Sequence, residues 1–143
     1  MKIVIFDIDG TLADCRNRLH HLNKSPKDWE SFFAEMDADP PNMPVVELCR
    51  AMHRQGHRIV LCTGRYERHR GQTETWLNRY SIPYHEIRMR KDGDKRSDSE
   101  IKQEMIVTDE SQHILFIVED RSRNVQMWRS RGFVCLQCDT GEF

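Results

Sequence analysis

Three short apolar runs in this sequence are each followed by acidic, hydroxyl or basic side chains. The three groups are Asp7-Ile8-Asp9-Gly10-Thr11 after residues 3–6, Thr63-Gly64-Arg65 after residues 59–62, and Glu119-Asp120-Arg121 after residues 114–118. Clustered carboxylates repel one another unless a cation lies among them, and hard oxygen ligands suit Mg²⁺. These side-chain types therefore predict a Mg²⁺ site with room for a phosphoryl group, and Arg65 and a lysine would help to hold that group.

These side chains come together only if the apolar runs are strands of one sheet. Runs at residues 3–6, 59–62, 114–118 and 133–136, with a weaker one near Ile87, alternate with helical patterns. Strands buried on both faces are continuously apolar, so this alternation is typical of an α/β fold with a doubly wound, mostly parallel sheet. Ligands of such sheets bind beyond the carboxyl ends of the strands, which is where the acidic residues fall.

Capping signals place the helices between these strands. Pro44 suits a helix first turn, and apolar residues at helical spacing follow it up to Gly56. Ser97 with Glu100 resembles a capping box at the start of another helix. Ser122 is expected to cap the last helix, which contains Val125 and Trp128.

The segment after the first acidic motif is too long for an ordinary connection. About thirty residues (14–43) precede the next helix, whereas βα loops usually have about 2 to 6 residues. Trp29, Phe32, Phe33 and Met36 recur there at helical spacing. We expect one domain spanning residues 1–143, in which residues 14–43 form a small lid over the strand ends. Packing of the aromatic residues on the main core is the alternative.

The order of these motifs resembles the haloacid-dehalogenase-like (HAD) phosphatases. Their signature is DxDGT after a strand, then a Ser or Thr after another strand, a Lys, and an acidic pair. The matching positions are Asp7-Ile8-Asp9-Gly10-Thr11, Thr63, Lys102 and Glu119-Asp120. Lys91 and Lys95 lie nearby in the sequence, but the Ser97 cap places Lys102 in the first turns of a helix, which favours Lys102.

The resemblance implies a role for each matching residue. Asp7 would attack phosphorus and form an aspartyl-phosphate, and Asp9 would be acid and then base, with a carboxyl partly protonated near neutral pH. Mg²⁺ would be held by Asp7, the Asp9 backbone carbonyl and Asp120. The residues implied to bind the substrate are Thr63, Arg65 and Lys102.

Within the superfamily, the chain is similar to the 3′-phosphatase domain of phage-type polynucleotide kinase/phosphatases. Glu119-Asp120-Arg121, Val125-Gln126-Met127-Trp128-Arg129 and the final Gly141-Glu142-Phe143 carry this similarity most strongly. It implies removal of a 3′-phosphate from a DNA or RNA end. Glu119 stands where that branch usually has Asp, so its metal role stays open. The sequence has no Walker motif, so we expect phosphatase activity only, with room for a separate kinase or ligase partner.

Two other functions remain open at this stage. One is a HAD phosphatase that acts on free nucleotides or small metabolite phosphates. The other is a non-catalytic phosphate-binding module, against which the pair Asp7 and Asp9 argues, because simple anion binding gains nothing from clustered carboxylates.

Composition limits the location and the partners of the protein. The longest apolar runs are far shorter than the about 20 residues of a membrane span, and the first is cut by Asp7 before it reaches signal-peptide length. We therefore expect a cytoplasmic protein without a membrane partner. The net charge is −1, but residues 50–100 contain 12 basic and 7 acidic side chains. That segment suits brief capture of a phosphorylated strand end.

Overall fold

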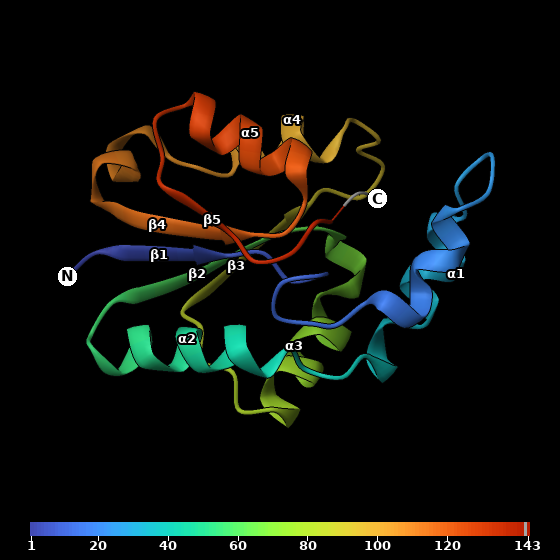
Figure 1. Cartoon of the computed structure of the whole chain (residues 1–143), viewed down its shortest axis with the longest axis horizontal. Helices are drawn as coiled ribbons and strands as arrows, with labels where there is room; N and C mark the ends of the chain where they lie inside the picture. Colours follow the sequence, from blue (N-terminus) through green and yellow to red (C-terminus); the bar gives the residue numbers. More distant parts are fainter. Residues whose placement is uncertain (142) are drawn as a thin grey trace.

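The computed structural model describes residues 1–141 and 143, and it has an α/β fold (Figure 1). The strands are β1 (Ile3–Phe6), β2 (Arg58–Tyr66), β3 (Glu86–Arg90), β4 (Ile114–Glu119) and β5 (Cys135–Gln137). The α-helices are α1 (Trp29–Ala34), α2 (Met43–Arg54), α3 (Arg70–Arg79), α4 (Asp98–Glu104) and α5 (Ser122–Ser130). The 3₁₀ helices are η1 (Arg16–Leu22), η2 (Met36–Ala38), η3 (Glu67–His69) and η4 (Thr108–His113).

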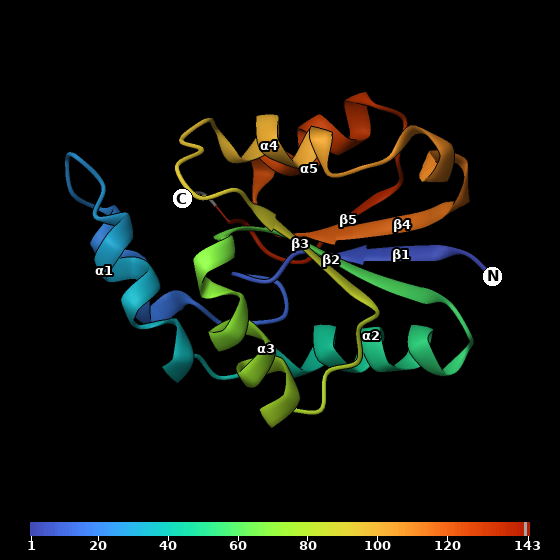
Figure 2. The same ribbon diagram turned by 180° about the vertical axis from the view of Figure 1, so that it is seen from behind.

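The five strands form one parallel sheet in the order β3-β2-β1-β4-β5. Helices α2 and α3 cover one face, and α4 and α5 cover the other (Figures 1 and 2). Val4 and Phe6 of β1 pack in the cluster that holds α2 and α3, whereas Ile5 packs in the cluster that holds α5. Because β1 is buried on both faces, its run is apolar throughout, and the predicted doubly wound fold is confirmed.

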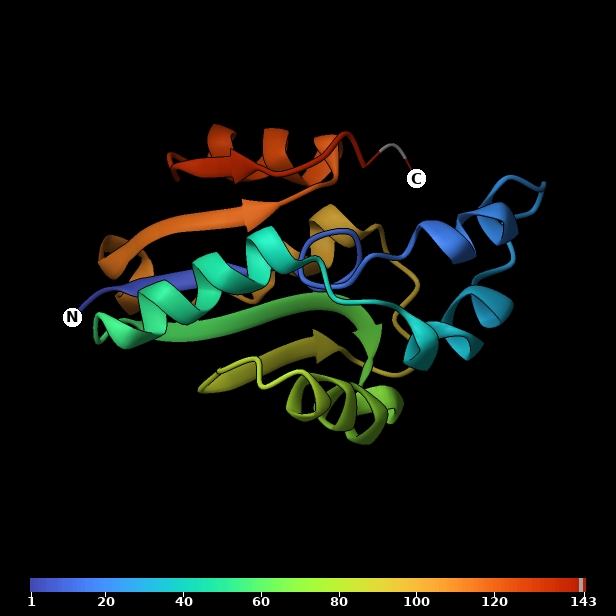
Figure 3. The same cartoon turned by 60° about the horizontal axis from the view of Figure 1, so that its bottom comes forward.

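The strand register brings the acidic motifs to one edge of the sheet. Phe6 pairs with Leu61 of β2 on one side and with Val118 of β4 on the other. The residues that follow, Asp7 and Glu119, therefore leave the sheet at the same level. Figure 3 shows the arrowheads of the strands directed toward the end of the molecule at which α1 lies.

Two of the three helix starts predicted from capping signals are confirmed. The Ser97 hydroxyl accepts a hydrogen bond from the backbone N–H of Glu100 and so caps α4, as predicted. Pro44 lies in the first turn of α2. The prediction for α5 was wrong by one residue, because Arg121 is the N-cap and Ser122 is the first helical residue. β2 is also longer than expected and includes Thr63, Gly64 and Arg65.

The segment of residues 14–43 builds a cluster of its own beside the sheet. Its ends lie together, since Ala13 bridges Pro41 and the Asp14 N–H donates to the Pro40 carbonyl at 2.9 Å. The buried apolar residues of this cluster are Cys15, Leu22, Phe32, Phe33 and Met36. The aromatic stripe thus packs in a cluster separate from the two clusters against the sheet. That this segment acts as a lid stays a prediction.

Among the described residues, no helix combines the length and the apolar character that a membrane crossing requires.

Candidate active site

Three carboxylates meet at the carboxyl ends of β1 and β4. Oxygen atoms of Asp7, Glu119 and Asp120 all lie within 4.8 Å of one another. All three residues are buried. Burial, reinforced by the charge of Asp7, raises the pKa values of Glu119 and Asp120. The cluster is therefore short of positive charge.

Lys102 is the cation that contacts this cluster. Its Nζ lies 2.8 Å from an Asp7 oxygen, 2.8 Å from a Glu119 oxygen and 3.5 Å from an Asp98 oxygen. Burial opposes its charge, but the three carboxylates prevail and raise its pKa well above the ordinary value. Lys91 and Lys95, the alternatives from the sequence, are exposed. Lys102 lies in the last turn of the short helix α4, and this position brings it to Asp7.

A hydroxyl and a tight turn complete the surroundings of Asp7. The Thr11 hydroxyl lies 3.1 Å from the second Asp7 oxygen and 3.3 Å from an Asp120 oxygen. Gly10 has φ +84°, and a Cβ there would fall on the Asp120 carboxylate. Glycine is required at this position because it both adopts the left-handed conformation and leaves space for Asp120.

Asp9, only two residues from Asp7, lies in the opposite electrostatic environment. Its carboxylate contacts the Arg65 guanidinium at 2.7 Å and the Arg18 guanidinium at 2.6 Å. Burial alone would raise the pKa of Asp9, but the two guanidinium groups outweigh it and hold the pKa below its ordinary value. The two guanidinium groups thus favour the ionised form of Asp9 in this conformation, whereas the resemblance implied a partly protonated carboxyl.

Arg18 is a site residue that the sequence patterns did not reveal. It is buried on η1, where its guanidinium also contacts Asp39 at 2.5 and 2.8 Å and donates to the Phe32 carbonyl at 2.9 Å. It therefore links the inserted segment to Asp9. A single arginine in an unusually long connection belongs to no motif, and only the position of that connection above the strand ends hints at its role.

The other predicted substrate ligands face inward. Arg65 is buried, and besides Asp9 its guanidinium donates to the Thr73 hydroxyl at 3.1 Å. The buried Thr63 hydroxyl accepts the Arg65 N–H at 3.2 Å. Contacts of Thr63, Arg65 and Lys102 with a substrate remain predictions, since here these groups are engaged with the protein itself.

Asp98 is a second residue that the sequence patterns missed. It is the first residue of α4, and the Asn124 amide donates to its carboxylate at 2.7 Å. Arg90 and Arg121 lie 3.4 Å from it. A Cβ at Gly64 would fall on this carboxylate, so the glycine of the Thr63-Gly64-Arg65 motif allows the close approach of Asp98 to β2.

A cavity of about 790 Å³ opens onto Asp7, Asp9 and Asp120 and extends toward the inserted segment. Its walls combine positive charge with aromatic rings. The basic residues that line it are Lys27, Arg68, Arg90, Lys95, Arg96, Arg121 and Arg123. The phenylalanine, tyrosine and tryptophan residues that line it are Trp29, Phe32, Phe33, Tyr66 and Phe143.

Comparisons with known proteins agree with this geometry over the whole chain. The family described as "Polynucleotide kinase PNKP phosphatase domain" matches residues 1–143. A chain of a Pnkp1/Rnl/Hen1 complex is 32% identical, with a TM-score of 0.85 over 99% of this chain and 47% of that one. A chain of the Pnkp1/Rnl/Hen1 RNA repair complex is 31% identical, with a TM-score of 0.84 over 100% of this chain and 44% of that one. This chain thus spans less than half the length of either.

A more distant structure shares the fold alone. The class C acid phosphatase from Bacillus anthracis with tungstate bound is 14% identical, with a TM-score of 0.66 over 100% of this chain and 69% of that one.

Proposed function

The chain belongs to the family of polynucleotide kinase PNKP phosphatase domains and is a HAD-type phosphatase, and on this basis we propose that it removes 3′-phosphates from polynucleotide ends. The reaction would depend on Mg²⁺ and pass through an aspartyl-phosphate on Asp7. The observation that carries the substrate assignment is the basic, aromatic cavity that opens onto Asp7.

The cavity suits a strand end because its walls offer both kinds of contact that single strands use. Basic side chains follow a phosphate backbone, and aromatic rings stack on bases without a sequence preference. Lys95 and Arg123 line the cavity and form no ion pair with any described residue, so their charges are available to an incoming phosphate. A small phosphate ester would need only part of this surface.

Asp7 is oriented for attack on phosphorus. Lys102 contacts one of its carboxylate oxygens and Thr11 the other, which restricts rotation of the carboxylate. In the first step an Asp7 oxygen forms a bond to phosphorus while the bond from phosphorus to the 3′-oxygen breaks. The leaving oxygen takes a proton from Asp9 and becomes the 3′-hydroxyl.

In the second step water hydrolyses the aspartyl-phosphate. Asp9 accepts a proton from the water, the phosphorus–oxygen bond to Asp7 breaks, and inorganic phosphate leaves. The ionised state of Asp9 in this structure suits this step. Donation of a proton in the first step requires that Asp9 first becomes protonated, which means that the contacts with Arg18 and Arg65 loosen.

The acidic cluster fits a Mg²⁺ ion. Three buried carboxylates within 4.8 Å with one contacting lysine form a set of hard oxygen donors that lacks positive charge. Asp7, Asp120 and the Asp9 carbonyl would hold the ion, and Lys102 contacts one oxygen of Asp7 and one of Glu119. When bound, Mg²⁺ would neutralise charge on the transferred phosphoryl group.

We further propose that the phosphatase acts beside a separate kinase or ligase activity in the cytoplasm. The two similar chains described above are more than twice as long as the part matched here, and they belong to Pnkp1/Rnl/Hen1 assemblies. Phosphate removal at a 3′ end leaves the hydroxyl group that end joining requires, which gives such a partner a substrate.

A substrate panel with inorganic-phosphate detection tests the proposal. It contains 3′-phosphorylated DNA and RNA oligonucleotides, the 5′-phosphorylated oligonucleotides as matched controls, a nucleoside 3′-monophosphate and a sugar phosphate, each with Mg²⁺ or with EDTA. We expect release from the 3′-phosphorylated oligonucleotides only, and loss of release with EDTA. Faster hydrolysis of the nucleotide or the sugar phosphate would overturn the substrate assignment, and activity in EDTA would overturn the Mg²⁺ requirement.

A further inference from the structure

Two histidines and a glutamate form a second cluster on the inserted segment, apart from the acidic cluster. His20 and His21 lie at the end of η1, and Glu35 is the residue between α1 and η2. One nitrogen or oxygen atom from each side chain lies within 4.8 Å of the other two. These residues do not line the cavity that opens onto Asp7. The cluster therefore lies outside the cavity in which the proposed reaction takes place.

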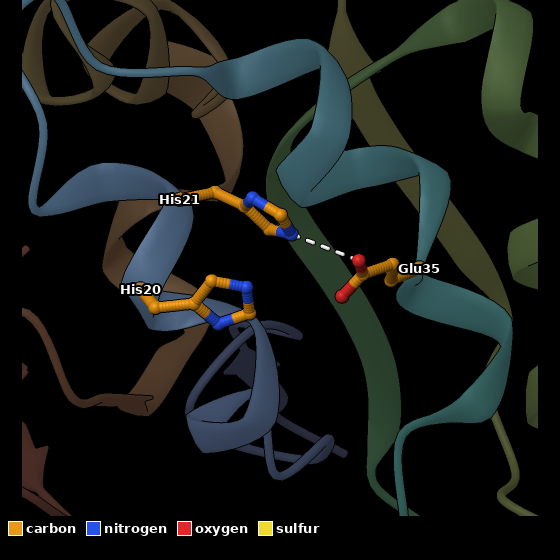
Figure 4. A group of neighbouring side chains, drawn as sticks. All are labelled: His20, His21 and Glu35. Atoms are coloured by element: carbon orange, nitrogen blue, oxygen red, sulfur yellow. Dashed lines mark hydrogen bonds and ion pairs between the residues drawn. The ribbon is translucent and has the colours of Figure 1, made fainter.

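The three side chains are already arranged around a common point. The His21 Nε2 lies 2.8 Å from a Glu35 oxygen, and the centres of the two imidazole rings are 3.9 Å apart. Figure 4 shows a ring nitrogen of His20 on the side of its ring that faces His21 and Glu35. The His21 Nδ1 is buried, so Nε2 is the nitrogen of this ring that faces the group.

We propose that His20, His21 and Glu35 bind a borderline divalent cation of the Zn²⁺ class. Two imidazole nitrogens and one carboxylate oxygen are a donor set used for zinc, whereas Mg²⁺ prefers oxygen ligands. On binding, the ion would take the place of the proton between the His21 Nε2 and the Glu35 oxygen, which now lie 2.8 Å apart. Water would occupy the remaining coordination positions, because His20 and Glu35 are exposed on their outer sides.

The position of the site indicates what an ion would do there. It would join η1 to the end of α1, two elements that contact each other within the inserted segment. The same 3₁₀ helix carries Arg18, which holds Asp9. A bound ion would thus stabilise the segment from which Arg18 reaches the active site, without contact with the substrate.

Zinc titration of the whole chain tests this site, with Mg²⁺ in excess so that the acidic cluster is occupied. Binding is measured by calorimetry, and the imidazole signals of each histidine are followed by NMR. The informative variants are His20→Gln and Glu35→Gln, because both residues have exposed side chains. The matched control is His53→Gln, since His53 on α2 contacts the His85 ring but belongs to no group of three possible metal ligands among the described residues.

We expect Zn²⁺ to shift the ring signals of His20 and His21 and to leave those of His53 and His85 in place. Loss of a second-shell partner weakens metal affinity by about 10- to 100-fold, so loss of a direct ligand in either variant should cost at least about 10-fold. The control variant should bind as the parent chain does. Equal binding by the parent and both variants, or unchanged signals of His20 and His21, would overturn the proposal and leave His21 and Glu35 as an ion pair only.

Discussion

The two aspartates of one motif, Asp7 and Asp9, lie in opposite electrostatic environments. Asp7, Glu119 and Asp120 form a buried group of three carboxylates that Lys102 contacts. The pKa values of Glu119 and Asp120 are raised. Around Asp9, one carboxylate contacts two guanidinium groups, and its pKa falls. The difference separates two tasks. Excess negative charge around Asp7 attracts a metal ion, whereas excess positive charge around Asp9 favours an ionised carboxylate.

The two environments also come from different parts of the chain. The charged groups around Asp7 lie at the end of β4, in the residue that follows it and on α4, all of which belong to the main α/β layers. One of the two partners of Asp9, Arg18, lies in the inserted segment between residues 14 and 43. Movement of this segment would therefore alter the surroundings of Asp9 while those of Asp7 stay intact.

Replacement of the nucleophile should have the largest effect. Asp7→Asn keeps the size of the side chain but removes the attacking oxygen charge, so we expect phosphate release to fall by at least about 10⁴-fold. The far-ultraviolet circular dichroism spectrum should remain that of the parent chain. Release at the parental rate would show that Asp7 is not the nucleophile, and would remove the basis for assigning the two environments to different tasks.

Removal of Arg18, one of the two cations beside Asp9, should have the next largest effect. Arg18→Gln leaves the buried Asp39 and part of the Asp9 carboxylate without a partner, which should destabilise the fold by about 3–5 kcal/mol. The measurement is urea unfolding. The double variant Arg18→Gln/Asp39→Asn removes the unpaired charge as well and should recover part of the loss. No recovery would mean that Arg18 acts through its packing on Phe32 instead.

An alanine at Gly10 should disturb the acidic cluster. Gly10 and Gly56 both have positive φ, but a Cβ at Gly10 falls on Asp120, whereas nothing lies within 4 Å of a Cβ at Gly56. Gly56→Ala should therefore cost only the strain of the left-handed backbone, about 1–2 kcal/mol in unfolding experiments. Gly10→Ala should cost more and should also raise the Mg²⁺ concentration needed for activity. An unchanged Mg²⁺ requirement would contradict the close packing of Asp120.

The smallest effect is expected for Lys95, which lines the cavity away from both Asp7 and Asp9. Lys95→Ala removes one free charge from the cavity wall, so KM for a 3′-phosphorylated oligonucleotide should rise by a few-fold, and the slope of log affinity against log salt should fall by about one. Lys91→Ala is the control, because Lys91 is exposed and does not line the cavity. Equal effects of the two variants would indicate general attraction rather than a contact within the cavity.

The group formed by Asp7, Glu119 and Asp120 was predictable from local patterns. Each carboxylate follows an apolar run, and the parallel arrangement of buried strands brings the ends of such runs to one edge of the sheet. The position of Lys102 followed from the Ser97 cap, which the structure confirms. These inferences succeeded because strand ends and helix caps depend on a few neighbouring residues.

The contacts of Asp9 with Arg18 and Arg65 are encoded by no local pattern, although the motif of Arg65 placed it at this edge of the sheet. Arg18 lies nine residues beyond Asp9 in an irregular segment, and Arg65 lies 56 residues beyond it. The resemblance implied a partly protonated Asp9, because a general acid needs a proton to donate. The two guanidinium groups that lower its pKa could be counted only after these side chains were placed.

By itself, the sequence determined the parallel α/β fold and the edge of the sheet at which the carboxylates gather, since both depend on local periodicity and on the direction of buried strands. Only the tertiary structure decided which charges surround each of the two aspartates. Electrostatic interactions depend on distance in space and on burial, and the packing of the inserted segment against the strand ends sets both for Asp9.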